Sequence, residues 1–280
     1  MQTRLLVAIS ACGITFTSLT AHAARVSGQG TWESTLLARD LDGNLSTVEA
    51  YYDTDLDITW LKDANYSATQ YANSGGAEGD SDGRWTWAGA NNWAATLDPY
   101  GSNITGWRLP DTNPVNGLAY DYGFQNDGAS DKGYNISAPG SLYAGSAGSE
   151  LAHMFYNTLG NIGYYDRFGA GPSCTPPDYC LSNIGPFLIP NASDSAFGNV
   201  PFWSATEYHG PTGFPPRPGA WSFSFDHGYQ GFSGSLSFNQ YAWAVHDGDM
   251  GSAVVPTLSS VWLFGSGLLG LGSMAMRKKT

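Results

Sequence analysis

Residues Trp221 to Phe225 read WSFSF, and this clean alternation is the feature of the sequence that decides the fold. Aromatic side chains at every second position lie on one face of a β-strand, and the two serines then lie on the other face. The segment 241–245 repeats the same period of two, and residues 202–208 are also expected to form a strand. We therefore expect the last third of the chain to form antiparallel strands.

A further strand is expected at residues 51–61, which read YYDTDLDITWL. Large or β-branched side chains occupy alternate positions from 52 to 60. Asp53, Asp55 and Asp57 fall on the opposite face, which we expect to be in contact with solvent. The whole segment is therefore expected to form one strand.

Two segments repeat apolar residues with the helical spacing i, i+3, i+4 and i+7. Thr86 precedes the first segment as an N-cap, and Gly160 ends the second, which covers residues 150–159. The apolar positions are Ala90, Trp93, Ala94 and Leu97 in the first helix, and Leu151, Met154, Phe155 and Thr158 in the second. The low content of Glu, Lys and Leu disfavours longer helices. The expected fold class is thus α+β, with two short helices, long loops and antiparallel strands.

The chain has ten tryptophans, and five of them stand in patterned segments. These are Trp60, Trp107, Trp203, Trp221 and Trp243. A large ring in such a segment is more often part of the core than of a ligand-binding surface, so we expect these five to be buried. A ligand-stacking surface is the alternative.

Cys174 and Cys180 enclose the short segment TPPDY. Cys12 lies in a segment that is expected to be removed on export, so the other two form an even pair in an oxidising compartment. We expect a disulfide that closes a small surface ring. A metal site is the alternative, and it lacks further soft ligands nearby in the sequence.

The N-terminus resembles a secretory signal peptide over residues 1–23. Arg4 supplies positive charge, residues 5–14 are apolar, and residues 21–23 read AHA, an A-x-A cleavage site. The apolar run is shorter than the roughly 20 residues that span a bilayer. An exported domain is therefore expected over residues 24–250, and a buried N-terminal helix is the alternative.

Residues 251–280 form a tail with the features of a membrane segment. No charge interrupts residues 258–276, and Arg277, Lys278 and Lys279 follow directly. Because basic residues stay cytoplasmic, a transmembrane helix here would hold the domain outside the inner membrane of a Gram-negative-type bacterium. Glycines within the span weaken a lasting helical anchor, so we expect a temporary one. A plain single-pass anchor is the alternative.

Val255 and Pro256, the run VWLFGSGL and the basic end resemble the PEP-CTERM sorting signal. The resemblance implies an exosortase-type enzyme as a partner, which would cut near the proline and release or transfer the protein. The expected location is the cell surface or the extracellular space. This tail departs from the pattern in keeping a single proline, which bears on how efficiently it is processed.

Six blocks between residues 51 and 249 follow one another as TWL, WTWAGANNWAATL, GWRLP, FWSATEY, AWSFSFDHG and AWAVHDGD. This order resembles the Lcl C-terminal domain family, and GWRLP and FWSAT are its most specific blocks. The resemblance implies a C-type-lectin-like fold and the binding of polysaccharide. It supplies no catalytic residues.

The chain is acidic, with 24 Asp and Glu against 12 Lys and Arg. Four of the basic residues lie in the two terminal segments, so the exported part is more acidic still. Such a charge repels nucleic acid, anionic lipid and sulfated polysaccharide. Neutral glycans, cationic peptides and divalent cations remain as partners.

Tyr208, His209, Asp226 and Tyr229 lie near turns in the last third of the chain. Binding residues gather on loops that a rigid scaffold holds in place. Aromatic faces beside carboxylates suit sugar rings, which they stack against and hydrogen-bond. We therefore expect these four residues to bind the ligand.

The loop at residues 75–83 reads GGAEGDSDG. Glu78, Asp80 and Asp82 offer the hard oxygen ligands that calcium prefers, so calcium is a candidate cofactor, with a plain solvated loop as the alternative. The loop also matches G-x-S-x-G, but no apolar strand precedes it to aim the serine. The histidines form no zinc-binding motif. We therefore expect no enzyme.

The expected function is non-catalytic binding at the cell surface or in the extracellular matrix, with polysaccharide as the ligand. A structural matrix or biofilm protein without a specific small ligand is the main alternative. A secreted enzyme is a weaker one.

Overall fold

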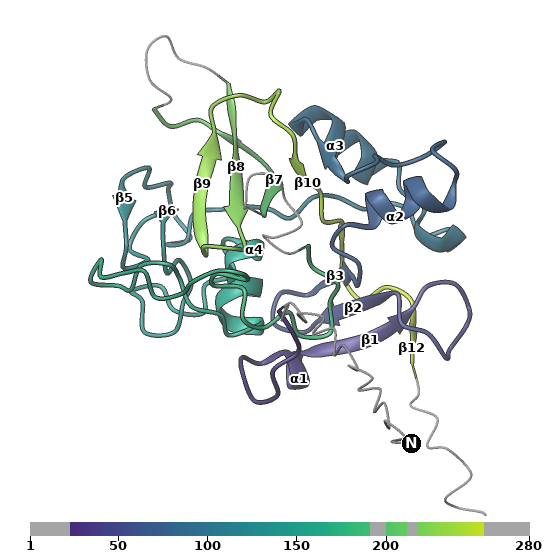
Figure 1. Cartoon of the computed structure of the whole chain (residues 1–280), viewed down its shortest axis with the longest axis horizontal. Coiled ribbons are helices and arrows are strands. Elements are labelled where there is room, and N and C mark those ends of the chain that lie inside the picture. Colours follow the sequence, from purple (N-terminus) through teal and green to yellow (C-terminus); the bar gives the residue numbers. More distant parts are fainter. Residues whose placement is uncertain (1–22, 191–199, 212–217, 255–280) are drawn as a thin grey trace, which may run out of the picture.

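Strands β7 (Pro201–Tyr208), β8 (Gly219–Ser224) and β9 (Tyr229–Ser233) form the centre of a seven-stranded sheet. The computed structural model describes residues 23–190, 200–211 and 218–254 (Figure 1). β8 pairs antiparallel with both of its neighbours, and its Phe223 is buried. The strand expected from WSFSF is confirmed.

Short strands complete this sheet, whose order is β4-β10-β7-β8-β9-β6-β5. Two of its pairings, β10 with β7 and β5 with β6, are parallel. The short strands are β4 (Arg84–Trp85), β5 (Phe124–Gln125), β6 (Lys132–Gly133) and β10 (Gln240–Tyr241).

A second sheet has five strands in the order β11-β3-β2-β1-β12, and each neighbouring pair is antiparallel. Its strands are β1 (Leu36–Asp40), β2 (Ala50–Asp53), β3 (Ile58–Leu61), β11 (Val245–Asp247) and β12 (Ser252–Ala253). The chain leaves the first sheet after β10 and enters the second at β11. The continuous strand expected at residues 241–245 is therefore wrong, because this segment is shared between the two sheets.

The single strand expected at residues 51–61 is also wrong, because the chain folds back within it. β2 and β3 pair there as an antiparallel hairpin. Asp53 is fully buried, and its Oδ1 accepts hydrogen bonds from the backbone N–H groups of Asp55 and Leu56 at 3.0 and 3.4 Å. A carboxylate that bonds the backbone two residues further on initiates a turn. Asp53 thus starts the turn instead of facing solvent.

Both expected helices are confirmed. Thr86 caps the first, since its side chain accepts a hydrogen bond from the backbone N–H of Gly89 at 3.2 Å. The second covers residues 150–158 and is followed by Gly160, whose φ is +68°. The helical segments are α1 (Trp32–Thr35), α2 (Tyr66–Asn73), α3 (Trp87–Ala95), η1 (Pro99–Gly101), α4 (Glu150–His153) and η2 (Met154–Thr158). Helix α2 was not expected from the sequence.

The expected α+β, C-type-lectin-like fold is wrong. The structure is mainly sheet, with 25% of residues in strands and 15% in helices, and it contains two sheets. Strands of two or three residues supply much of this difference, since they are too short to show any period in the sequence.

Several expectations fall on residues outside the described ranges. They are the signal peptide up to residue 22, the span at residues 258–276, and the sorting residues Val255, Pro256 and 277–279. Across the described residues, no helix has the length and apolar character needed to cross a membrane.

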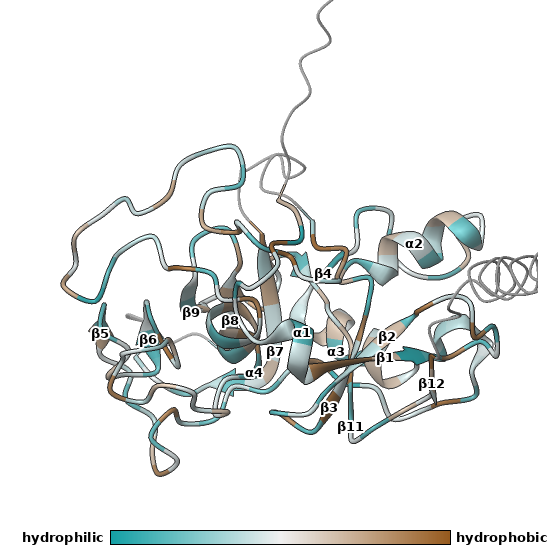
Figure 2. Ribbon diagram, turned by 90° about the horizontal axis from the view of Figure 1, so that it is seen from below, coloured by the Kyte–Doolittle hydropathy of each residue, from teal (hydrophilic) through white to brown (hydrophobic). Residues whose placement is uncertain are grey.

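The two sheets meet around Trp243, which lies where the chain passes from one to the other. Its ring contacts Trp60 of β3 and Phe202 of β7, at centroid distances of 4.7 and 5.8 Å. Its Nε1 donates a hydrogen bond to the carbonyl of Leu61 at 2.7 Å. Figure 2 shows hydrophobic colouring in β3 and β8 and paler or hydrophilic colouring over α2. All five tryptophans expected in the core are at most 2% exposed, so that prediction is confirmed.

Candidate functional site

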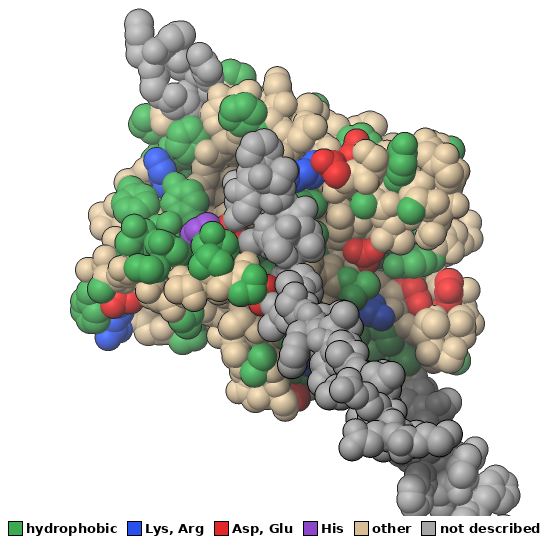
Figure 3. Space-filling view, in the orientation of Figure 1, with side chains coloured by type: hydrophobic (Ala, Val, Ile, Leu, Met, Phe, Trp, Pro, Cys, Tyr) green, Lys and Arg blue, Asp and Glu red, His purple; other side chains and the backbone are tan. Residues whose placement is uncertain are grey.

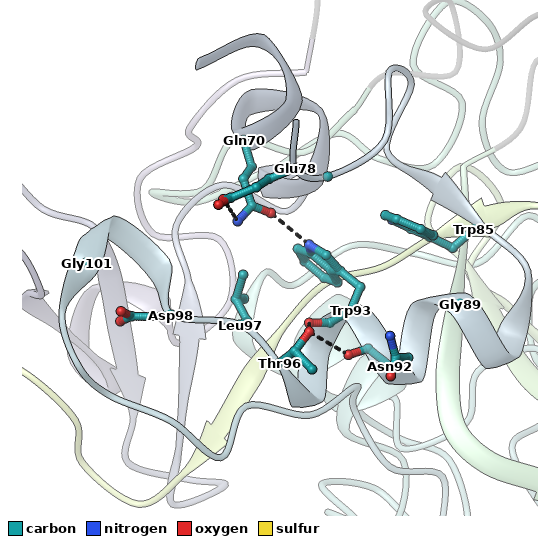
Figure 4. A pocket seen from close by; sticks show the side chains of 11 residues that line it. Gln70, Glu78, Trp85, Gly89, Asn92, Trp93, Thr96, Leu97, Asp98 and Gly101 are labelled. Atoms are coloured by element: carbon teal, nitrogen blue, oxygen red, sulfur yellow. Dashed lines mark hydrogen bonds between the residues drawn. The ribbon is translucent and has the colours of Figure 1, made fainter. Parts of the chain in front are cut away.

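A cleft of about 640 Å³ lies between α2 and α3, at the edge of the seven-stranded sheet (Figure 4). Its volume falls within the range of roughly 300–1,000 Å³ that is usual for small-ligand sites. Residues from α2, the acidic loop, β4, α3 and the turn after α3 line it: Gln70, Glu78, Gly79, Trp85, Gly89, Asn92, Trp93, Thr96, Leu97, Asp98 and Gly101.

Helix α3 presents two adjoining stripes of side chains. Its core stripe is the apolar one expected from the sequence. Gly89, Asn92, Trp93 and Thr96 form a second stripe at the same spacing of i, i+3, i+4 and i+7, and this stripe lines the cleft. Trp93 belongs to both stripes, so its ring links the core to the cleft.

The acidic loop at residues 75–83 packs closely against α2. The backbone N–H of Asp80 donates to the carbonyl and the hydroxyl of Ser67, at 3.3 and 3.0 Å. Gly79 has a φ of +76°, and a Cβ there would collide with the backbone of Ser67. A glycine is therefore required for this close approach. The contact places Glu78 at the rim of the cleft.

A chain of hydrogen bonds fixes the middle of the cleft (Figure 4). Nε1 of Trp93 donates to Oε1 of Gln70 at 3.0 Å, and Nε2 of Gln70 donates to Oε2 of Glu78 at 2.9 Å. Nε1 of Trp85 donates to the hydroxyl of Ser67 at 2.8 Å. Both indole N–H groups thus have protein partners, and the rings are held in place.

The two carboxylates of the cleft each keep one oxygen uncommitted within the described part of the chain. Glu78 uses Oε2 for Gln70, and Asp98 uses Oδ1 to accept from Ser102 and from the backbone N–H of Asn103. Figure 4 shows Trp85 and Asp98 toward opposite ends of the cleft, with Trp93 between them. The second carboxylate oxygens of Glu78 and Asp98 can therefore accept hydrogen bonds from a ligand.

The four residues expected to bind ligand divide into two groups. Tyr208 pairs with Gly219 at one end of β8, whereas Tyr229 pairs with Ser224 at the other end. Tyr208 is 4% exposed, and its ring stacks on that of Phe232 at 3.9 Å. The structure therefore does not bring the four together as one site, and none of them lines the cleft.

His209 is exposed just beyond β7, where its imidazole lies 3.8 Å from the carboxylate of Glu207. At the other end of β8, Asp226 is fully buried and Tyr229 is half-buried. Tyr229 packs against Tyr134 at a centroid distance of 5.2 Å, and burial raises the pKa of Tyr134 to about 12. The ring of Tyr134 therefore covers part of Tyr229.

The carboxylate of Asp226 positions a neighbouring histidine. It is fully buried, accepts hydrogen bonds from Ser224 and from the backbone N–H of Val200, and pairs with the imidazole of His227. Burial opposes ionisation of this carboxyl, but the hydrogen bonds from His227 and Ser224 outweigh it and lower its pKa. Asp226 thus holds His227 instead of facing a ligand.

The predicted disulfide between Cys174 and Cys180 is confirmed. The ring that it closes carries Tyr179, whose side chain packs against the imidazole of His227 at 5.1 Å. The backbone N–H of Cys180 donates to the carbonyl of Asp226 at 2.9 Å. The ring is therefore fastened to the end of β8.

The three acidic residues proposed for calcium do not converge. Glu78 points to Gln70, Oδ1 of Asp80 accepts from the backbone N–H of Asp82, and Oδ1 of Asp82 accepts from that of Arg84. Calcium at this loop stays a prediction. Over the described ranges, three carboxylates lie within 4.8 Å of one another at a different place, formed by Asp40, Asp42 and Glu49. Such acidic groups are common without an ion, and we assign no metal to them.

Sequence patterns could have revealed part of the cleft. The second stripe of α3 has a helical period that is visible in the sequence once the helix is placed. Gln70 carries no such signal, because α2 contains no Leu, Ile, Val or Met and its N-cap residue, Asn65, makes no side-chain capping bond. Its place opposite α3 depends on tertiary packing.

The comparisons with known proteins give no relative for this chain. No family model matches it, and neither the curated proteins nor the solved structures contain a significant match. The resemblance to the Lcl C-terminal domain family therefore stays a prediction, and function has to be argued from the cleft.

Proposed function

We propose that the cleft between α2 and α3 binds carbohydrate without converting it. The supporting observation is that the half-buried indole ring of Trp85, whose N–H is already bonded to protein, lines the same cleft as amide, hydroxyl and carboxylate side chains. Sugars present C–H faces that stack on aromatic rings and hydroxyls that hydrogen-bond to amides and carboxylates. The lining offers both kinds of contact.

The setting that we propose is the cell surface or the extracellular matrix. The N-terminal signal peptide and the PEP-CTERM-like tail would bring the domain there, with temporary anchoring in the inner membrane and processing by an exosortase-type enzyme. The net charge of −12 favours a ligand that is not anionic and argues against nucleic acid.

Binding without catalysis is proposed because the cleft lacks an activated nucleophile in its described lining. None of those residues is a serine, cysteine or histidine. Two carboxylates in one cleft can hydrolyse glycosidic bonds, however, so hydrolysis is the reaction to test for. Release of reducing ends from a bound polysaccharide would replace this proposal with an enzyme.

A glycan-array assay of the purified protein tests the proposal, with Trp85→Ala as the binding-site variant. Trp87→Ala is the matched control, because Trp87 lies two residues further on, is also half-buried and does not line the cleft. We expect selective binding that Trp85→Ala weakens and Trp87→Ala does not. A folded protein that binds no glycan would overturn the proposal and favour the structural matrix role.

The same assay addresses calcium when it is run with added calcium and with chelator. Glu78 is held by Gln70 instead of by the other two acidic residues of the loop, so we expect similar binding in both conditions. Loss of binding in chelator would instead assign calcium to the loop or to another acidic group.

A further inference from the structure

The charges around the cleft are of one sign. Glu78 and Asp98 both line it, and no lysine, arginine or histidine belongs to its described lining. Asp80 and Asp82 continue the acidic loop directly beyond Glu78. Figure 3 shows several acidic side chains on the side of the molecule that carries α2. A ligand in the cleft therefore meets a negative potential.

Each of the two carboxylates in the cleft has one oxygen that accepts no hydrogen bond from the described residues. Oε1 of Glu78 and Oδ2 of Asp98 have no partner within the described residues, whereas their other oxygens do. A sugar hydroxyl can fill such a position. An ammonium group fills it better, because it donates up to three hydrogen bonds and also neutralises the carboxylate.

The aromatic part of the lining favours the same kind of ligand. The face of an indole attracts a cation through the quadrupole of its ring. Trp85 is half-buried and its N–H is engaged by Ser67, so its ring is the part left to offer, whereas Trp93 is only 7% exposed. A stacked sugar ring that carries an ammonium group would use both the indole of Trp85 and a carboxylate.

We propose that the cleft selects glycan chains with free amino groups, such as polymers of 2-amino sugars that are not N-acetylated. This selectivity rests on the carbohydrate binding proposed above and names its substrate class. The two carboxylates hold the ammonium groups, and Trp85 stacks on a ring that bears one of them. Exposed ion pairs and cation–π contacts are individually modest, so together they favour the amino sugar by about tenfold.

Calorimetric titration of the purified protein at about pH 6 tests the selectivity, because amines and carboxylates are then both largely charged. The probes are β-1,4-linked hexasaccharides of glucosamine, of N-acetylglucosamine and of glucose. We expect the glucosamine chain to bind about tenfold more tightly than the other two. We also expect this preference to shrink as salt rises from about 50 mM to about 500 mM, because exposed charges are screened.

Charge variants separate the cleft from the acidity of the whole protein. The double variant Glu78→Gln and Asp98→Asn should bring the ratio of the affinities for the amino and acetylated chains close to one. The matched control is Asp55→Asn, an exposed aspartate in the turn between β2 and β3, which should leave the ratio unchanged. An equal loss in the control would assign the preference to overall charge and overturn the inference.

The failures of the two proposals can be told apart. If no hexasaccharide binds, the carbohydrate function fails, and the selectivity fails with it. If all three bind with equal affinity, the function stands and only the selectivity is overturned. Tighter binding of the acetylated chain would also overturn the selectivity, because an uncharged amide would then be the preferred group.

Discussion

Tryptophan serves two regions of this protein in different ways. Between the two sheets, Trp60 and Trp243 are 0% exposed, with protein packed on both faces of each ring. In the cleft, Trp85 is only half-buried, although its N–H is bonded as firmly as that of Trp243. The indole N–H groups of Trp243 and Trp85 are both hydrogen-bonded, so these two residues differ in how much of the ring is exposed.

A ring that is held by hydrogen bonds and is partly exposed therefore indicates a binding surface better than an aromatic residue that merely lies near a turn. Tyr208 lies near a turn, yet it is only 4% exposed and the ring of Phe232 stacks on it. Substitutions in the first region should therefore change the free energy of unfolding, and those in the cleft should change affinity. Variants in each region test this division.

The largest effect is expected for Trp243→Ala. The substitution removes the ring that packs between the two sheets, and it leaves the carbonyl of Leu61 without its hydrogen-bond donor. Removal of a buried tryptophan costs about 3–5 kcal/mol of unfolding free energy. Urea denaturation followed by circular dichroism measures the loss. A shift of the midpoint no larger than that of Trp85→Ala would contradict the division between core and cleft.

A somewhat smaller loss of unfolding free energy is expected for Arg108→Ala, at a residue that does not line the cleft. Arg108 binds the carboxylate of Glu150 through two hydrogen bonds of 2.8 Å and contacts Asp247 at 2.6 Å. Its removal leaves Glu150, which is 9% exposed, without its cation, at a cost of about 3 kcal/mol. Urea denaturation measures this as well.

The double variant Arg108→Ala with Glu150→Gln is the control for that prediction. It should recover part of the lost stability, because no uncompensated charge then remains buried. The pair lies outside the cleft, so glycan affinity in the folded variants should stay unchanged. Weakened binding by a folded Arg108→Ala protein would show that the two regions are coupled.

A third, smaller effect is expected for Trp85→Ala, and it should appear in affinity. Loss of a stacking ring should weaken glycan binding by about tenfold, equivalent to about 1.4 kcal/mol. The carbonyl of Trp85 still accepts the hydrogen bond from Nε1 of Trp203, so the fold should persist. Calorimetric titration beside Trp87→Ala gives the comparison. Equal weakening in both variants would place the ligand elsewhere.

The smallest effect expected is a change in how the free energy of unfolding depends on pH, and it concerns the buried Asp226. The pKa of Asp226 lies below its ordinary value of 3.8, since the bonds from His227 and Ser224 outweigh burial. The ionised carboxylate therefore stabilises the fold above pH 3.8, and this contribution is lost as pH falls through the lowered pKa. Urea midpoints measured in acid should fall less steeply for Asp226→Asn than for the unaltered protein. Parallel curves would contradict this role.

Asp53 provides an internal contrast for the same experiment. Burial raises its pKa, although bonds from the backbone and the nearby His153 act in the other direction. Its contribution to stability is therefore lost as pH rises through the raised pKa, opposite in sign to that of Asp226. Asp53→Asn should accordingly steepen the fall of stability in acid.

Local patterns predicted the parts of the fold that depend on neighbours in sequence. Thr86 and the apolar stripe after it predicted α3, and WSFSF predicted β8. The segment at 51–61 failed because Asp53 bonds the backbone ahead of it and turns the chain, which outweighs a two-residue period. The cleft was missed because Gln70 and Glu78 come close to Trp93 only when α2 packs near α3, and no local sequence pattern predicts that packing.

Reasoning from the sequence alone missed α2 and the hairpin of β2 and β3, but it predicted α3, the helix at 150–158, strand β8, the five buried tryptophans and the pairing of Cys174 with Cys180. These properties follow from spacing and side-chain type, and both act over a few residues. Three features depend on tertiary packing: residues 240–247 join two sheets, Tyr208 and Tyr229 lie at opposite ends of β8, and Trp85 stays half-buried. The physical reason is that strand pairing and ring coverage depend on residues distant in the chain, whose positions no local period records.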